Sequence, residues 1–236
     1  MRTSEAEVVI MKPWFIRDTD FTRVVSEEDR ATFMRVCPDR RYQKGDTIFR
    51  MGDPATDMHV IAEGQVKLVS PTASGQERIL AICGPFNFIG EAFLLEESHY
   101  RVDAVALTDV TTCPMSREQF LQLSVTAPTF ALSFAEILAS HLFHCRQQLS
   151  DGYDPIKFRV VKVLIEQAHR FGEQVGDTDW CELRTELKHE EIASIISGTR
   201  VAVTMAFSEL REEGLVEGSR GSYRLYMPGL VALAEH

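Results

Sequence analysis

The chain has 236 residues, enough to bury a full core and to form two modest domains. Its net charge of −10 excludes a protein that coats nucleic acid through general basicity, so any DNA contact requires a local surface. No apolar run approaches the about 18 residues that cross a bilayer, and the first residues lack the pattern of a secretory signal. We therefore expect a cytoplasmic protein with no membrane partner.

The cysteines are scattered and form no CxxC motif, which argues against a sequence-readable zinc site or an iron–sulfur cluster. They are Cys37, Cys83, Cys113, Cys145 and Cys181. In a cytoplasmic chain this pattern is typical of reduced thiols rather than of redox sensing.

The first half of the chain after a lead-in over residues 1–20 has the pattern of an antiparallel β-domain, which we place over residues 21–127. β-rich runs alternate with glycine-containing turns at intervals of about eight to twelve residues. The segment "MHVIAEGQVKLV", for example, predicts two short strands about Gly64. This spacing predicts a sandwich or barrel of the jelly-roll kind.

From Pro128 the apolar period changes to about 3.5 residues, which predicts one long helix over residues 128–150. A seam of small and branched side chains runs along it at steps of three and four: Leu132, Ala135, Ala139, Leu142, Arg146 and Leu149. Such a seam can pack on the β-domain or on a second copy of the helix, and its residue types favour a homodimer.

The segment "SDGYDP" ends that helix, with Asp154 expected as an N-cap and Pro155 as the first residue of the next helix. Residues 155–236 then form a third unit. Three helical segments are followed by two short strands about "GSRGS". This order predicts a winged helix-turn-helix, and the whole chain is assigned to the α+β class.

The stretch "HEEIASIISGTRVAVTMAFSELREEGLV" has the pattern of the helix-turn-helix itself. Its inward positions are Ile192, Ile195, Ile196, Val203 and Phe207, Thr199 caps the second helix, and the outward positions are Arg200, Val201, Thr204 and Met205. Outward side chains near the start of such a helix meet base edges in the major groove. Arg200 could donate two hydrogen bonds to guanine, and Val201 could only touch a thymine methyl group. The alternative is an ordinary helical hairpin with an exposed arginine.

Three motifs precede the long helix and the helix-turn-helix: "KGDTIFRMGD", "MHVIAEGQVKL" and "FIGEAFLLEESHYRVDAVALTDV". Through these motifs and the order of its parts, the chain resembles, over about residues 25–227, the cyclic AMP receptor protein/FNR family of bacterial transcription regulators. The helix-turn-helix resembles the nitrogen-control (NtcA-like) branch most closely. The resemblance implies a β-roll sensor, a dimerisation helix and a regulator, expected to be an activator, of pseudo-palindromic promoter DNA. It also implies contact with RNA polymerase, which we place at residues 169–180.

Three departures from the family pattern concern the DNA-binding part. Family members that read a TGTGA-like half-site carry Arg-Glu and a second arginine, where this chain has Arg200, Val201 and Met205, so its target should differ. Ser197 precedes Gly198 where relatives have glycine first, so either Ser197 is left-handed or the turn shifts by one residue. Six basic and seven acidic residues lie between Arg184 and Arg224, so phosphate contact depends on their placement on one face. The candidates for backbone contacts are Lys188, His189, Arg220 and Arg224, with a solvated surface as the alternative for each.

The resemblance also indicates a ligand site in the β-roll. In cyclic-nucleotide-binding relatives a glutamate after the "FIG" turn accepts the ribose hydroxyl and an arginine ten residues later pairs with the cyclic phosphate. Here the matching residues are Glu91, next to Gly90, and Arg101. The neighbouring hydroxyl residue is replaced by Val102, and the adenine-contacting positions of the long helix hold Cys145 and Arg146.

Three alternatives for the ligand therefore stay open: a cyclic nucleotide such as cyclic AMP, another small anion, or no ligand, with control by the protein's abundance. No cofactor is certain. His141 and His144 lie three residues apart, but two ligands without a third do not make a metal site. No catalytic motif is present, so we expect a regulator rather than an enzyme; a bare anion-binding module without a DNA role is the remaining alternative.

Overall fold

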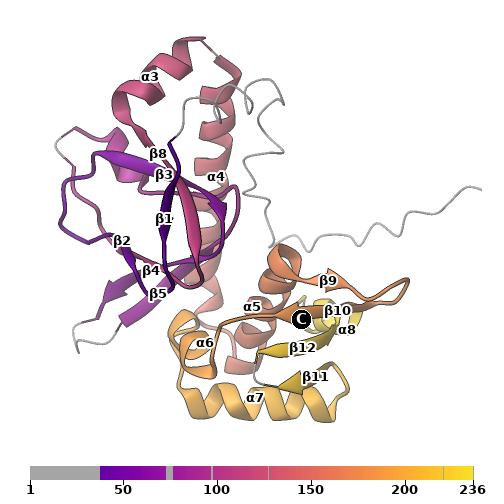
Figure 1. Cartoon of the computed structure of the whole chain (residues 1–236). Coiled ribbons are helices and arrows are strands. Elements are labelled where there is room, and N and C mark those ends of the chain that lie inside the picture. The colour runs from indigo at the N-terminus through magenta and orange to yellow at the C-terminus, as the bar shows by residue number, and fades with distance from the viewer. Residues whose placement is uncertain (1–37, 73–76, 97, 127, 220, 236) are drawn as a thin grey trace, which may run out of the picture.

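The fold is described by a computed structural model for residues 38–72, 77–96, 98–126, 128–219 and 221–235. A β-rich N-terminal part is joined through one long helix to a C-terminal part made of helices and a small sheet (Figure 1). This is the α+β architecture that the sequence predicts. The predicted lead-in, residues 1–20, lies outside the described residues.

The N-terminal part is a sandwich of two four-stranded antiparallel sheets. The first sheet contains, in spatial order, β1 (Arg40–Tyr42), β8 (Val110–Ser116), β3 (Asp57–Glu63) and β6 (Phe88–Ile89). The second contains β2 (Thr47–Phe49), β7 (Asp103–Ala106), β4 (Val66–Pro71) and β5 (Glu77–Cys83). Side chains from both sheets, such as Ile61 on β3 and Val66 on β4, meet in one buried cluster. The sandwich places β5 at the edge of the second sheet.

The two strands that the sequence predicts about Gly64 are present, but they belong to different sheets. Strand β3 pairs with β8 and β6, whereas β4 pairs with β5 and β7. Gly64 has a φ of 84°, and a Cβ atom there would lie 2.1 Å from the carbonyl oxygen of Asp109. The segment is an arch between the two sheets, and its backbone requires glycine.

The long helix, α4, spans Pro128–Asp151 and packs one of its faces on the sandwich. Phe130, Phe134 and Ile137 are buried, and the rings of Phe134 and Phe88 stack with centroids 4.5 Å apart. Helix α3 (Arg117–Thr126) and the 3-10 turn η1 (Glu91–Leu94) close the same cluster. The predicted seam lies on the opposite face of α4, so the face that packs on the β-domain and the seam are separate.

No single helix among the described residues is long and apolar enough to cross a membrane. The bent pair made of Arg117–Thr126 and Thr129–Phe143 passes a test of length and composition only when its two segments are joined. Its phenylalanines at 120, 130 and 134 are buried in the protein core.

The C-terminal part contains the three predicted helices and the predicted hairpin, with further elements between and after them. In chain order they are α5 (Ile156–Phe171), β9 (Glu173–Gln174), β10 (Trp180–Arg184), α6 (His189–Ile195), α7 (Arg200–Glu212), β11 (Val216–Ser219), β12 (Ser222–Tyr226) and α8 (Met227–Ala234). The strands form one sheet in the order β11–β12–β10–β9, so the wing is the edge of a four-stranded sheet. Phe207 is fully buried beneath this arrangement.

The start of α5 differs from the expectation. The helix begins at Ile156 with Pro155 as its N-cap residue, so the assignment of Asp154 as the cap and of Pro155 as the first helical residue is wrong by one position. The carboxylate of Asp154 instead accepts a hydrogen bond from Lys162, with Nζ and Oδ2 2.7 Å apart. A long-range partner therefore takes the side chain that a local rule assigns to the cap.

The helix-turn-helix is seated on the edge of the sensor sandwich, through α6 and strand β5 (Figure 1). The Ser194 hydroxyl donates to the carbonyl oxygen of Glu77 at 3.0 Å and accepts from the amide of Ile79 at 2.9 Å. Arg170 of α5 donates to the carbonyl oxygen of Ile82 at 2.6 Å. These contacts satisfy backbone groups that an edge strand leaves unpaired.

We expect Ser194→Ala to weaken the contact between α6 and β5 by about 1 kcal/mol. Both hydrogen bonds to β5 are lost, and the buried Ile79 amide is left without its acceptor. Amide hydrogen exchange at Ile79 should accelerate roughly fivefold to tenfold. Ser208→Ala is the matched control, since that hydroxyl only bonds within α7, to the carbonyl oxygen of Thr204. Unchanged exchange at Ile79 in the Ser194 variant would show that these bonds do not hold the two parts together.

The expectation of reduced cysteines holds for only some of them. Cys83, Cys145 and Cys181 are free, and burial raises the pKa of the Cys83 thiol to about 12. Cys113 is disulfide-bonded, so the expectation is wrong for that residue. Pairing depends on distance in the fold, which wide separation along the sequence does not reveal. Cys37 lies outside the described residues.

Candidate nucleic-acid interface

The candidate interface is built on α7, whose N-terminal end is fixed by two local features. The Thr199 hydroxyl accepts a hydrogen bond from the amide of Ala202 at 3.2 Å, which confirms the predicted cap. Ser197 has a φ of 53°, so of the two alternatives for the turn, the left-handed serine is the correct one. The amide of Gly198 closes the turn on the carbonyl oxygen of Ala193 at 2.8 Å. The turn between α6 and α7 is thus made with a left-handed serine followed by Gly198.

The two faces of α7 have opposite character, as predicted. Val203 and Phe207 are fully buried against α6 and the sheet. Arg200, Val201, Thr204 and Met205 are all exposed. An exposed valine and methionine next to an arginine at the first turn of a capped helix form a surface suited to the edges of bases.

Arg200 is ion-paired in the free protein. Its Nη1 atom lies 3.5 Å from Oε1 of Glu190, and the two side chains are 70% and 66% exposed. An exposed pair of this kind contributes little to stability and exchanges readily with other partners. The guanidinium is therefore available to a base or phosphate that approaches α7.

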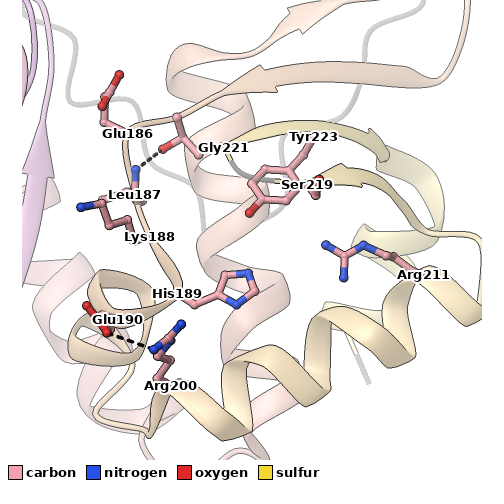
Figure 2. Close-up of a pocket in the computed structure, with 11 residues that line it drawn as sticks. Glu186, Leu187, Lys188, His189, Glu190, Arg200, Arg211, Ser219, Gly221 and Tyr223 are labelled. Carbon is pink, nitrogen blue, oxygen red and sulfur yellow. Dashed lines mark hydrogen bonds and ion pairs between the residues drawn. The ribbon is translucent and has the colours of Figure 1, made fainter.

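A cavity of about 410 Å³ opens between α7, the start of α6 and the wing (Figure 2). It is lined by Thr185, Glu186, Leu187, Lys188, His189, Glu190, Arg200, Arg211, Ser219, Gly221 and Tyr223. The lining contains three permanent cations, one histidine and two carboxylates. Although acidic residues outnumber basic ones in this part of the sequence, the cavity itself therefore has a net positive charge. A hollow with cations and backbone at its rim suits a phosphate group.

His189 forms part of the inner wall of this cavity. Its Nδ1 atom lies 3.0 Å from the hydroxyl oxygen of Thr204, and its ring stacks on Phe207 with centroids 4.6 Å apart. Burial, followed by the charges of Arg211 and Arg200, lowers the pKa of the His189 imidazole.

The other predicted backbone-contact residues divide between the cavity and its surroundings. Lys188 is exposed and lines the cavity. Arg224 pairs with Glu217, with Nη1 and Oε2 3.0 Å apart, and lies over the ring of Trp180, so it does not line the cavity. Arg220 lies outside the described residues.

Arg211 and Tyr223 were not predicted as site residues, although both line the cavity. Nε of Arg211 donates to the carbonyl oxygen of Gly218 at 3.1 Å, which ties α7 to the wing. Arg211 lies eleven residues after Arg200, three helical turns along the same side, and this spacing could have identified it. The alternation of side chains along the strand predicts that Tyr223 faces inward. No sequence signal shows whether an inward side chain lines a cavity or lies in the core.

Two of the predicted ligand residues of the β-roll follow residues that contact each other, Gly90 and Tyr100. Gly90 has a φ of 86°, and a Cβ atom there would lie 3.1 Å from the ring of Tyr100. Glu91 directly follows Gly90 and Arg101 directly follows Tyr100, and both charged side chains are exposed. Val102 is half-buried next to Arg101.

The predicted seam of α4 is exposed along its length in the single chain. Its residues all face solvent: Leu132, Ala135, Ala139, Leu142, Arg146 and Leu149. The neighbouring Cys145 is exposed as well. Leu142, for example, is 52% exposed although it is apolar. The opposite face of the same helix is buried in the sandwich, so this stripe remains available to a second helix.

Among the described residues, no group of three or more histidine, cysteine or acidic side chains is placed to hold a metal ion.

Two family models match the chain in the order of its parts. One, described as a cyclic nucleotide-binding domain, matches residues 39–126; the other, a Crp-like helix-turn-helix domain, matches residues 158–235. The cyclic AMP receptor protein of Thermus thermophilus is 29% identical over 184 residues, which is 78% of this chain and 81% of that protein. A global nitrogen regulator of Synechococcus elongatus is 27% identical over 198 residues, 83% of this chain and 87% of that protein. The structure of FixK2 from Bradyrhizobium japonicum superposes with a TM-score of 0.72 at 19% identity, covering 84% of this chain and 96% of that one.

Proposed function

The chain belongs to the cyclic AMP receptor/FNR family of transcription regulators, and we propose that it binds pseudo-palindromic promoter DNA as a homodimer through the exposed face of α7. The observation that carries the proposal is the arrangement at the start of α7. There a capped helix presents Arg200, Val201 and Met205 to solvent beside a cation-lined cavity. Homologues of the chain are transcription regulators rather than enzymes.

In this proposal the bases are read by α7 and the phosphates are held around the cavity. Arg200 leaves Glu190 and donates two hydrogen bonds to a guanine, while Val201 contacts a thymine methyl group. Thr204 and Met205 meet the next bases, and Thr199 lies at the phosphate beside the helix start. Lys188 and His189 contact backbone phosphates, and Arg220 remains a proposed contact. The half-site that Arg200, Val201 and Met205 read therefore differs from the TGTGA-like half-site, which family members read with Arg-Glu and a second arginine.

The exposed stripe on α4 supports the proposed homodimer. Two copies of the stripe bury their leucines and alanines against each other, and the two-fold axis places two α7 helices about 34 Å apart. Arg146 lies on this stripe, so its guanidinium requires an anionic group of the second copy or of a ligand.

We also propose that the β-roll binds a cyclic nucleotide such as cyclic AMP. The match of residues 39–126 to the cyclic nucleotide-binding domain supports this, as does the exposure of Glu91 and Arg101, which directly follow the contacting residues Gly90 and Tyr100. Glu91 accepts from the ribose hydroxyl and Arg101 pairs with the phosphate, with Gly90 and Val102 beside them and Arg146 from the long helix. Binding there shifts the population of domain arrangements and so the spacing of the two α7 helices.

Contact with RNA polymerase is proposed for residues 169–180, at the end of α5 and in the β9–β10 hairpin. Strand β9 is the edge of the sheet farthest from the wing strand β11, and in Figure 1 the hairpin extends away from α7. It therefore stays accessible when α7 lies on DNA, which suits an activator. Promoter binding and polymerase contact place the protein in the cytoplasm.

The experiment that tests the proposed function is a selection of genomic fragments with the purified protein, run with and without cyclic AMP. Enrichment of one palindromic sequence is expected. Enrichment only with the nucleotide would make the β-roll site its switch, and equal enrichment in both arms would make the protein a regulator controlled by abundance. If no sequence is enriched in either arm at low salt, the DNA-binding function is wrong.

The ligand site has its own test, by thermal unfolding. We expect cyclic AMP at about 100 times its dissociation constant to stabilise the protein by about 2.7 kcal/mol. Glu91→Gln and Arg101→Gln should each abolish most of this shift, because each removes one charged hydrogen-bond partner. Arg78→Gln, the same change at an exposed position on β5, is the control. A wild-type protein whose unfolding does not respond to cyclic AMP would overturn the nucleotide assignment.

A further inference from the structure

The cavity beside α7 contains one side chain whose charge can change near neutral pH, His189. Its ring is fixed from two sides: it stacks on Phe207 at 4.6 Å with an interplanar angle of 21°, and Nδ1 lies 3.0 Å from Oγ1 of Thr204. Figure 2 shows the imidazole lying between Arg200 and Arg211. The ring therefore keeps one orientation whether or not it carries a charge.

The bonds of Thr204 determine which ring nitrogen carries the proton. The hydroxyl oxygen of Thr204 lies 2.9 Å from the carbonyl oxygen of Arg200, which can only accept, so the single hydroxyl hydrogen is donated there. The hydroxyl oxygen must then accept from Nδ1–H of His189. In the neutral imidazole Nε2 is consequently unprotonated, and its lone pair repels an anion. Protonation turns the same atom into a cationic donor.

The charges around His189 oppose that protonation in the free protein. Besides His189, the titratable and charged residues that line the cavity are Glu186 and Lys188 before α6, Glu190 on α6, Arg200 and Arg211 on α7, and Tyr223 on β12. Glu190 is engaged by Arg200. Burial and the two arginines together lower the pKa of the imidazole, so the neutral form prevails at neutral pH.

We propose that a DNA phosphate entering this cavity makes His189 take up a proton, so that the imidazolium becomes a ligand of the bound phosphate. The proposal rests on the proposed DNA-binding function and deepens it. A phosphate offsets the charges of Arg200 and Arg211 and adds an opposite charge near the ring, and both changes favour the charged form. Balance requires one proton from solvent for each His189 on binding.

Proton uptake by His189 makes DNA affinity depend on pH in one direction. Because the complex binds more protons than the free protein plus DNA, affinity falls as pH rises between the pKa of His189 in the free protein and its higher pKa in the complex. For each proton taken up, affinity falls about tenfold for every unit by which pH rises inside that window. Below the window His189 is charged in both states, and above it His189 is neutral in both, so the dependence is flat at both ends.

The test is fluorescence anisotropy of the labelled duplex recovered by the genomic selection, from pH 5.5 to 8.0 at fixed ionic strength. The wild-type dimer is expected to lose roughly tenfold to 100-fold in affinity over this range. His189→Gln should bind with a nearly flat profile close to the weak, high-pH limit of the wild type. His189→Lys, which keeps a permanent cation, should be flat and closer to the tight limit.

His99→Gln makes the same change at an exposed histidine of the β-roll and should retain the wild-type slope. Calorimetry in buffers of different ionisation enthalpy should show proton uptake by the wild type that His189→Gln abolishes. Tight binding without a pH slope, or a slope that persists in His189→Gln, would overturn the inference while leaving the DNA-binding function intact. Absence of binding to any duplex at every pH would overturn both.

Discussion

Arg200→Ala is expected to abolish recognition of the selected site. A bidentate arginine–guanine contact contributes about 1–3 kcal/mol of discrimination, and a symmetric dimer loses two, so specific affinity should fall about 30-fold to 10⁴-fold. The free energy of unfolding should change by less than about 0.5 kcal/mol, because the side chain and its ion pair with Glu190 are both exposed. Anisotropy with the selected and a scrambled duplex, together with urea unfolding, measures both quantities.

Two variants separate the loss of base contact from simpler effects of the change. Glu190→Gln breaks the same ion pair but frees Arg200, so its affinity should equal or exceed that of the wild type. Arg117→Ala, on α3, removes the same charge far from α7 and should leave specific binding unchanged. If Arg200→Ala still prefers the selected duplex over the scrambled one by the wild-type ratio, Arg200 does not read the site.

Leu142→Glu is expected to convert the dimer into a folded monomer. Leu142 lies on the exposed stripe of α4, so in the dimer its two copies approach the axis, where two carboxylates would be buried without partners. The monomer should keep its fold because the side chain is exposed in the single chain. Affinity for the full site should fall by at least about 100-fold, since only one half-site can be held at a time. Sedimentation and anisotropy measure the two effects.

Leu121→Glu is the matched control for the dimer variant, because Leu121 is equally exposed but lies on α3, away from the stripe. It adds the same charge and should leave both dimerisation and DNA affinity at wild-type levels. A Leu142→Glu protein that still sediments as a dimer would place the interface elsewhere.

Regular periodicity made several features of the DNA-binding part predictable. The buried positions of Val203 and Phe207, the exposure of Arg200 and Met205 and the cap at Thr199 all follow from local helical geometry, and the structure confirms each. The choice between a left-handed Ser197 and a shifted turn could not be made from sequence, because both close the same loop. The structure shows the left-handed form.

Features that depend on distant partners were not predictable. Strand β10 is only five residues long, and it becomes a strand because β12 and β9 flank it. Asp154 is of a residue type that often caps helices, but its carboxylate accepts a hydrogen bond from Lys162 instead. Ser194 reads as a surface position of α6, and only the placement of β5 beside it gives the hydroxyl its two backbone partners.

The cavity likewise combines residues that the sequence identifies with an enclosure that it does not predict. Arg200 and His189 were identified from the pattern of the helix-turn-helix, but the enclosure requires the wing, with Gly221 and Tyr223, to fold back towards α7. The hydrogen bond from Arg211 to Gly218 and the packing of Tyr223 on Phe207 hold the wing there. These contacts join segments from the end of α7 and the wing, and no local pattern encodes them.

A dimer that reads two half-sites on the same side of the DNA must distinguish two duplexes that differ only in the spacing of those half-sites. The first carries the selected palindrome, and the second carries the same half-sites with five base pairs inserted at the centre. The insertion rotates one half-site by about half a turn, so the two α7 helices can no longer reach both. Affinity is predicted to fall by at least about 100-fold at fixed salt. Equal affinity for the two duplexes would show that one dimer does not hold both half-sites at once.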